Sequence, residues 1–233
     1  LIPNNSLQLK SKYAYFWQIK NILNDKLYNK CKSKDLIFHH VAEVGVFLPE
    51  TSNILLFTKD NLKTTLVEAD PESVEKIRTY FSEYESVKLF PVAVWDSDGT
   101  VVLNKAKSST FVDELESSPA MVNDKYVEDD TKKIIVDSLT FDKIDDGTID
   151  LISIDIEGGE WYVLKYMKSR PSVISIETHW KNYTNPFIKE IKEWMKYNDY
   201  DIWYVDKSDT VYFKNGLFEL SMLEKLDIKL KNK

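Results

Sequence analysis

The sequence predicts an α/β fold built on an open, mostly parallel sheet, with helices on both faces and an antiparallel hairpin at its C-terminal end. Two observations predict it. Short apolar segments typical of buried strands alternate with segments of helical periodicity along most of the chain. Near the end, segments 200–206 and 210–215 alternate polar and apolar residues around a turn at 207–209, which is the pattern of a hairpin.

Length and composition indicate one packed domain. A chain of 233 residues with 43% hydrophobic and 13% aromatic residues can bury one large core. We therefore expect a single domain over residues 1–233, with a helical extension at 1–35 and a polar insertion at 105–133. Because the sequence does not begin with methionine, an origin as one domain of a larger protein stays open.

The charge balance argues against two classes of partner. The chain has 31 basic and 38 acidic residues, a net charge of −7 and no block of five like charges. We therefore expect neither a nucleic acid nor an anionic membrane surface as its main partner. Cys31 is the only cysteine, which excludes an internal disulfide and a thiolate zinc site, so we expect a cytoplasmic location. No apolar run approaches the roughly 20 residues that span a bilayer, so membrane insertion is not expected.

Start and stop signals place the individual elements. Asp70 and Pro71 form an N-cap and a first helical position directly after a strand, and Asn185 with Pro186 marks a similar start. The expected helices lie at about 9–28, 49–57, from 71 to about 84, 160–167 and 187–195. The expected strands lie at 37–45, 64–68, 88–95, 100–103, 150–154 and 173–179, and the turn 96–99 is expected to join 88–95 and 100–103 into a hairpin.

The segment 105–133 is polar, weakly periodic and longer than an ordinary connection. Such an insertion is either a lid or binding loop over a site, or a disordered segment. The sequence favours neither reading.

Ligands of open α/β sheets bind beyond the carboxyl ends of the strands, where the strand order reverses. Gly45 follows the first expected strand and lets the backbone turn close to a ligand, although a plain strand-end turn explains it equally well. Glu68 ends the next strand, where nucleoside-binding folds hold ribose hydroxyls. A carboxylate suits that role because it accepts two hydroxyl hydrogen bonds, and the alternative is a solvated acid beside a helix start.

Carboxylates and an imidazole crowd two further strand ends. Asp155, Glu157 and Glu160 surround a Gly-Gly turn, and Glu177 and His179 follow what we expect to be the adjacent strand. Like charges this close resist joint ionisation unless a cation, a helix N-terminus or a proton offsets them. The groups can form a general-base site or a divalent-metal site. The alternative is a set of surface acids and one strand-end histidine.

Other conspicuous side chains have a structural interpretation. His39 and His40 precede the core of the first strand, so one of them faces inward. Four aromatic residues are expected to pack in the core and on the sheet rather than to form a ligand cage: Trp194, Trp203, Tyr204 and Tyr212.

These segments together resemble the FkbM-type methyltransferases, a branch of the Rossmann-like class I fold that depends on S-adenosylmethionine, over about residues 41–213. The most specific part is 154–160, Ile-Asp-Ile-Glu-Gly-Gly-Glu, which is similar to the family's Ile-Asp-Val-Glu-Gly-x-Glu, with Ser153 in place of the family's preceding lysine. Segments 67–71, 91–99 and 136–139 are also similar to family segments. The loop 45–49 departs from the pattern, because it lacks the common Gly-x-Gly and asparagine.

The resemblance implies S-adenosylmethionine as the cofactor. Glu43 and Gly45 would lie along its methionine and ribose parts, Glu68 would take the ribose hydroxyls, and Asp155 would be nearest the transferring methyl group. Val92 and Ala93 would border the adenine. The implied cofactor-binding residues are therefore Glu43, Gly45, Glu68, Ala69, Val92, Ala93 and Asp155.

The resemblance also implies O-methylation of a sugar, a glycan or a glycosylated small molecule, and other domains of a multidomain glycan-modifying protein are conceivable partners. A hydroxyl is a poor nucleophile near neutral pH, so a base or a metal must assist. Asp155 and Glu177 are candidates to hold Mg²⁺, Mn²⁺ or Ca²⁺, or to position the acceptor hydroxyls. The expected catalytic residues are Asp155, Glu157 and His179, with Glu157 or His179 as the base, and the expected acceptor wall is Glu160, Trp161 and Trp180.

Two other classes of function stay open. The altered first loop is compatible with a catalytically inactive binding or interaction module. A nicotinamide-dependent oxidoreductase is the weaker alternative, because the sequence has no Gly-x-Gly-x-x-Gly.

Overall fold

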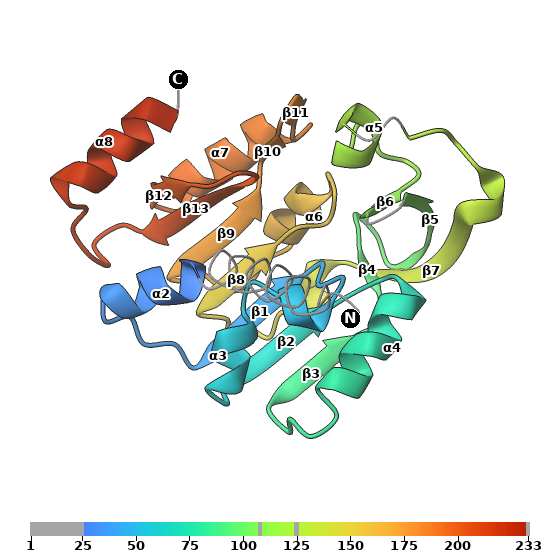
Figure 1. Cartoon of the computed structure of the whole chain (residues 1–233), viewed down its shortest axis with the longest axis horizontal. Helices are drawn as coiled ribbons and strands as arrows, with labels where there is room; N and C mark the ends of the chain where they lie inside the picture. The colour runs from blue at the N-terminus through green and yellow to red at the C-terminus, as the bar shows by residue number, and fades with distance from the viewer. Residues whose placement is uncertain (1–25, 107–108, 124–125, 232–233) are drawn as a thin grey trace, which may run out of the picture.

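The computed structural model describes residues 26–106, 109–123 and 126–231 (Figure 1). Its centre is a seven-stranded sheet of order β12-β13-β9-β8-β1-β2-β3. Six strands run in the same direction, and β13 runs antiparallel to its neighbours β9 and β12. The strands are β1 (His40–Val44), β2 (Lys63–Val67), β3 (Val87–Phe90), β8 (Leu151–Ile154), β9 (Val173–Glu177), β12 (Tyr200–Val205) and β13 (Asp209–Lys214). This confirms the predicted α/β class and the C-terminal hairpin.

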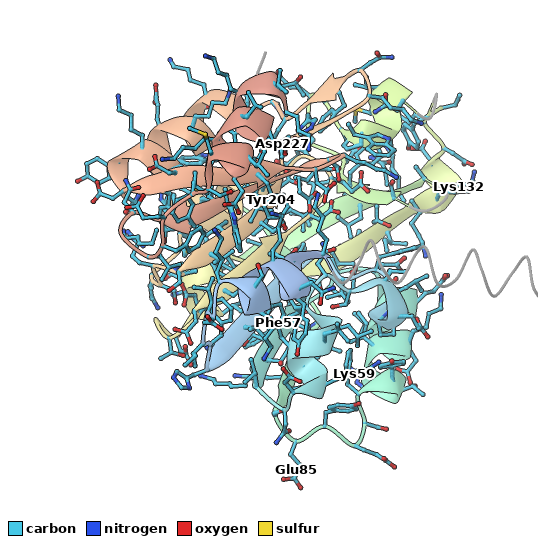
Figure 2. The ribbon with its side chains drawn as sticks, turned by 60° about the vertical axis from the view of Figure 1, so that its left-hand side comes forward. Phe57, Lys59, Glu85, Lys132, Tyr204 and Asp227 are labelled. Atoms are coloured by element: carbon cyan, nitrogen blue, oxygen red, sulfur yellow. The ribbon has the colours of Figure 1, made fainter. Side chains whose placement is uncertain are left out.

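Alternate residues of each strand point to opposite faces of this sheet, and helices cover both faces. Leu151 packs with side chains of α2, α3 and α4 on one face, and Ile152 packs with α6 and α7 on the other. Phe57 and Tyr204, labelled in Figure 2, belong to the first of these two cores. The helices are α2 (Lys26–Ser33), η1 (Pro49–Thr51), α3 (Leu55–Lys59), α4 (Pro71–Tyr80), α5 (Pro119–Asn123), η2 (Asp130–Lys132), η3 (Phe141–Lys143), α6 (Glu160–Lys165), α7 (Ile188–Tyr197) and α8 (Met222–Lys231).

The helix start predicted at Asp70 is present. The Asp70 side chain accepts a hydrogen bond of 3.0 Å from the Glu72 amide, and Pro71 occupies the first helical position. Val74 and Ile77 are buried beneath α4, as the apolar spacing predicts. The helix predicted at 9–28 lies mostly outside the described residues; α2 contains its end and continues to Ser33. No described helix has both the length and the apolar character needed to cross a membrane.

The hairpin predicted from 88–95 and 100–103 is wrong. Pro91 has no amide hydrogen and interrupts the segment, so β3 joins the main sheet while β4 (Ala93–Val94) begins a second one. That second sheet has the order β4-β7-β5-β6, with β5 antiparallel to both β6 and β7. Its other strands are β5 (Gly99–Ala106), β6 (Ser109–Val112) and β7 (Lys133–Leu139).

The insertion 105–133 contributes to a small core of its own. Its described parts form β6, α5 and η2, and Phe111, Leu115 and Ala120 are buried together with Leu103 and Trp95. This second sheet lies beside the main sheet (Figure 1). The described parts of the insertion are therefore folded, and a lid role for them stays a prediction.

His40 is the buried member of the histidine pair and gives the fold a pH dependence. Its Nδ1 and Nε2 lie 2.7 and 2.9 Å from the hydroxyls of Thr148 and Thr65. Burial, then Lys63, lowers the pKa of His40 from 6.5, so the unfolded chain takes up the proton more readily. This contribution to stability is present above about pH 6.5 and is lost as the pH falls below it.

We therefore expect His40→Gln to flatten the decline of the unfolding free energy below about pH 6.5, measured by urea denaturation across a pH series. His39→Gln is the matched control, because His39 is the exposed neighbour. An equally steep decline in His40→Gln and the wild type would show that His40 is not the titrating group.

Candidate functional site

A cavity of about 280 Å³ lies at the carboxyl ends of β1, β2 and β8. The strand order runs outward from β1 to β3 and resumes at β8 on the other side of β1, which is the switch point at which open α/β sheets bind ligands. The structure gathers these predicted site residues in the lining: Glu43, Gly45, Glu68, Ala69, Val92, Ala93, Asp155 and Glu157. It places these outside the lining: Glu160, Trp161, Glu177, His179 and Trp180.

Gly45 brings two strand ends into direct contact. Its φ is +86°, and its amide donates to the Val67 carbonyl at 2.9 Å. A Cβ atom at this position would lie 1.8 Å from the carbonyl oxygen of Asp155. The Asp155 amide in turn donates to the Val44 carbonyl at 2.9 Å. A side chain at position 45 would therefore separate the two strand ends that form the cavity floor.

Glu68 holds the loop that follows β1. One carboxylate oxygen accepts from the amides of Val46 and Phe47 at 3.1 and 2.7 Å. The other accepts from Ala69 and Asp70 at 2.9 and 2.8 Å. Burial raises the pKa of Glu68, and the amide donors oppose that rise. Phe47 adopts a left-handed φ of +55° in this loop and is 39% exposed.

Glu43 holds the other side of the same loop. Its carboxyl group accepts from the Asn53 amide at 2.8 Å and from the Ser52 hydroxyl. Burial raises the pKa of Glu43 to about 8, so the group is largely protonated at neutral pH. The two acids that the sequence places at the first two strand ends thus both organise the loop between β1 and α3.

One wall of the cavity is apolar and includes the second sheet. Val92 and Trp95, which follow β3 in the chain, line this wall, and Leu103 of β5 and Val112 of β6 complete it. The Trp95 ring packs against Tyr162 of α6 with centroids 4.3 Å apart. A flat, apolar wall of this kind suits an aromatic base.

Three carboxylates converge beside the cavity. Asp155, Glu160 and Glu177 each place one oxygen within 4.8 Å of the other two. Burial and then Glu157 raise the pKa of Asp155, and burial and then Asp155 raise the pKa of Glu177 to about 12. The sequence correctly places these acids at adjacent strand ends, since β8 and β9 are parallel neighbours.

Glu160 is fixed by protein donors. One oxygen accepts from the amides of Ile156 and Gly158 at 2.9 and 3.1 Å, and the other accepts from the Asn185 side chain. Glu160 is fully buried at the start of α6, so its carboxylate holds the Gly-Gly turn in place. The sequence alone does not indicate this contact with Asn185.

The predicted acceptor residues lie on different elements. His179 and Trp180 form β10 (His179–Trp180), which pairs with β11 (Tyr183–Thr184) in a small hairpin. The Trp180 carbonyl accepts from the Asn123 side chain of α5 at 2.9 Å, which ties the insertion to this hairpin. Trp161 packs against the main core instead. Tyr183, which the sequence analysis did not single out, is buried with its hydroxyl close to Gly158.

A protein-family comparison agrees with this arrangement. The model described as "Methyltransferase FkbM domain" matches residues 39–202, which span the sheet from β1 into β12. The chain belongs to this FkbM family. It is therefore a member of a family of S-adenosylmethionine-dependent methyltransferases, as the resemblance predicts.

Solved structures with similarity to this FkbM protein are distant in sequence. A Staphylococcus aureus protein proposed to be a caffeoyl-CoA O-methyltransferase is 10% identical, with 91% of this chain and 93% of that chain covered and a TM-score of 0.46. A SAM-dependent methyltransferase from Aquifex aeolicus is 10% identical, with 84% and 96% covered and a TM-score of 0.42. An SAH-bound methyltransferase from Podospora anserina is 10% identical, with 92% and 98% covered and a TM-score of 0.39. A search of curated proteins gave no match.

The cavity fits the cofactor that the FkbM family uses. Gly45 lets the ends of β1 and β8 meet at the cavity floor, and the apolar wall around Val92 and Trp95 can take an adenine. At the other end, the carboxyl groups of Asp155 and Glu157 line the cavity. An acidic end suits the ammonium and sulfonium charges of S-adenosylmethionine.

Proposed function

We propose that this FkbM protein transfers a methyl group from S-adenosylmethionine to a hydroxyl of a sugar, a glycan or a glycosylated small molecule. The observation that carries the proposal is the cluster of Asp155, Glu160 and Glu177 beside the cofactor cavity, together with Glu157 in the cavity lining. Carboxylates accept hydrogen bonds from hydroxyl groups, so such a cluster suits a polyhydroxylated acceptor.

The chain's own residues must align and deprotonate the acceptor. Bound S-adenosylmethionine would supply the methyl group on a sulfonium: the acceptor oxygen would bond to the methyl carbon as the carbon–sulfur bond breaks, with S-adenosylhomocysteine as the leaving group. Most of the barrier reduction comes from alignment of the reacting atoms. The hydroxyl proton passes to a side-chain base.

Glu157 is the better placed of the two candidate bases. It lines the cavity and has a left-handed φ of +59°, an uncommon conformation for a residue other than glycine. His179 lies outside the lining, with its Nδ1 2.9 Å from the Thr178 hydroxyl. We assign Glu157 as the base and keep His179 as the alternative. Asp155 and Glu177 would position acceptor hydroxyls or hold Mg²⁺, Mn²⁺ or Ca²⁺.

The acceptor wall would be built from the β10–β11 hairpin and the insertion. Thr110 and Val112 of the insertion line the cavity, and the contact between Asn123 and Trp180 joins the two parts. In this role 105–133 is a lid, and Trp180 offers an aromatic face to a sugar ring. Trp161 and Glu160 would support the wall from behind. A cytoplasmic location and further glycan-modifying domains as partners stay part of the same proposal.

The test is transfer of a labelled methyl group to a panel of sugars and glycosylated small molecules. With an accepted substrate, we expect Glu157→Gln to lower kcat by about 100-fold or more, the usual contribution of a general base. His179→Ala should lower kcat by less than about 10-fold if Glu157 is the base. Calorimetry measures the dissociation constant of S-adenosylmethionine for each variant, and kcat is compared at saturating cofactor, so that weaker cofactor binding does not lower the measured kcat.

Near-normal turnover in both variants would show that neither residue is the base. The alternative function, a catalytically inactive binding or interaction module, is favoured by the altered loop at Phe47. That alternative would be supported if calorimetry detected no binding of either S-adenosylmethionine or S-adenosylhomocysteine to a folded wild-type chain.

A further inference from the structure

The strongest unexplained feature is a cluster of buried polar groups, here called the chamber: the carboxyl groups of Asp155, Glu160 and Glu177 and the hydroxyl of Tyr183. We propose that this chamber is a divalent-cation site in which Glu160, a residue that sequence reasoning placed on the acceptor wall, supplies the third carboxylate. The inference that an ion binds depends only on the geometry of the chamber. Its role in orienting an acceptor hydroxyl rests on the proposed function.

The spacing of the three carboxylates suits an oxygen-coordinated cation. One oxygen from each lies within 4.8 Å of the other two. Oxygen ligands of Ca²⁺ lie at 2.3–2.6 Å from the ion, so two ligands on opposite sides are about 5 Å apart. Those of Mg²⁺, at 2.0–2.1 Å, are at most about 4 Å apart. Three oxygens that lie within 4.8 Å of one another can therefore all reach one divalent ion after a small contraction.

Two polar atoms of the chamber have no hydrogen-bond partner among the described residues. They are Oε2 of Glu177, a residue that is 6% exposed, and the hydroxyl of Tyr183, a residue that is 1% exposed. A buried polar atom without a partner is costly, and native proteins seldom tolerate one unless an ion or a bound molecule satisfies it. The Tyr183 hydroxyl would lie 3.3 Å from a Cβ atom on Gly158, in the turn that joins Asp155 to Glu160.

The lack of basic side chains around the chamber also favours a bound cation. None of the three carboxylates forms a salt bridge with a lysine, arginine or histidine in the described ranges. The Glu160 carboxyl group accepts hydrogen bonds from two backbone amides and the Asn185 side chain. Buried carboxylates without a cationic side chain are satisfied by a metal ion or by protons. A cation would compensate their charge and use the free oxygen of Glu177.

Asp155 connects the chamber to the cofactor cavity, because it belongs to both. Asp155 lines that cavity and is half-buried, whereas Glu160 and Glu177 are buried behind it. An ion at this point would sit between the cofactor site and the β10–β11 hairpin. The coordination positions that the protein leaves open would then face the cavity, where an acceptor hydroxyl arrives.

The test measures cation binding directly on the full chain freed of metal with a chelator. Ca²⁺ and Mn²⁺ are titrated by calorimetry, and Mn²⁺ also by electron paramagnetic resonance. We expect one ion per chain and a rise of Tm when it binds. Glu177→Gln should weaken binding at least 10-fold and lose most of the Tm rise, while its cation-free Tm is no lower than that of the wild type.

Asp209→Asn is the matched control. Asp209 lies opposite Glu177 in the register of β13 and β9 and is half-buried, but its oxygens accept from the hydroxyls of Ser208 and Ser175. The proposal predicts unchanged cation binding in this variant. Absence of binding at millimolar Ca²⁺ and Mn²⁺, as expected if shared protons satisfy the chamber, would overturn it, and so would equal binding by the wild type and Glu177→Gln.

The same samples separate this proposal from the proposed function. If one ion binds but no acceptor in the panel is methylated, the cation site stands and the proposed methyl transfer fails. If methyl transfer is undiminished in excess chelator and no ion binds, the methyl transfer stands and the cation site fails.

Discussion

Gly45→Ala is expected to abolish cofactor binding and to destabilise the fold by about 3–5 kcal/mol, since it adds left-handed backbone strain to overpacking in a rigid region. The added Cβ would lie 1.8 Å from the Asp155 carbonyl oxygen, and the backbone at φ +86° disfavours any side chain. The atom it meets is backbone in a hydrogen-bonded strand end, so no rotamer change relieves the contact. Urea denaturation measures the loss of stability, and calorimetry measures the loss of S-adenosylmethionine binding.

Gly147→Ala separates the clash from the conformational strain. Gly147 has nearly the same φ, +85°, but a Cβ there meets no atom within 4 Å. Its variant should lose only about 1–2 kcal/mol, the cost of the left-handed conformation alone, and should bind the cofactor normally. Equal losses of stability in the two variants would mean that the close contact with Asp155 is not the reason why position 45 requires glycine.

The contrast between these two glycines shows what sequence patterns can predict here. A glycine after a buried strand is recognisable, and the burial of β1, β8 and β9 follows from their apolar residues. The contact itself joins residues 45 and 155, which are far apart in the chain. Only the register of β1 against β8, in which Val44 lies opposite Ile154, brings them together.

The same limit explains the wrong hairpin. Segments 88–95 and 100–103 have the local signals of paired strands, and the chain does bend between them at 96–98, where Asp98 accepts from the Thr140 amide at 2.9 Å. That hydrogen bond is made to the segment after β7, and β5 pairs with β7 instead. Local alternation indicates a strand but not its partner, and Pro91 was the available sign that the first segment divides.

The sequence predicted that acids lie at neighbouring strand ends but did not indicate what each acid contacts. Acids at four strand ends could be predicted, because parallel strands bring their carboxyl ends to one edge of the sheet. What each acid holds depends on side chains from distant segments. Glu160 meets Asn185, and Glu68 meets the loop at Val46 and Phe47. The resemblance implies that Glu68 binds the ribose hydroxyls. Its carboxylate already accepts hydrogen bonds from four amides, so any ribose contact must share those oxygens.

Glu68→Gln is expected to cost about 2–6 kcal/mol of stability and to weaken S-adenosylmethionine binding by at least 10-fold. An amide nitrogen would replace one carboxylate oxygen and leave two buried amide donors unpaired, at about 1–3 kcal/mol each. The unpaired donors are either those of Val46 and Phe47 or those of Ala69 and Asp70. In the first case the loop after β1 detaches, and in the second the connection from β2 to α4 does. Urea denaturation and calorimetry measure the two effects.

Glu43→Gln is the control that makes the Glu68 result specific. Glu43 is an equally buried acid on the neighbouring strand, and its pKa of about 8 keeps it largely protonated at neutral pH. A glutamine amide mimics the protonated carboxyl: its oxygen can accept from the Asn53 amide, and its nitrogen can face the Ser52 hydroxyl. We expect a change below about 1 kcal/mol, the size of an ordinary substitution that keeps its hydrogen bonds. A loss as large as that of Glu68→Gln would imply that Glu43 is ionised and that both acids hold the loop by charge.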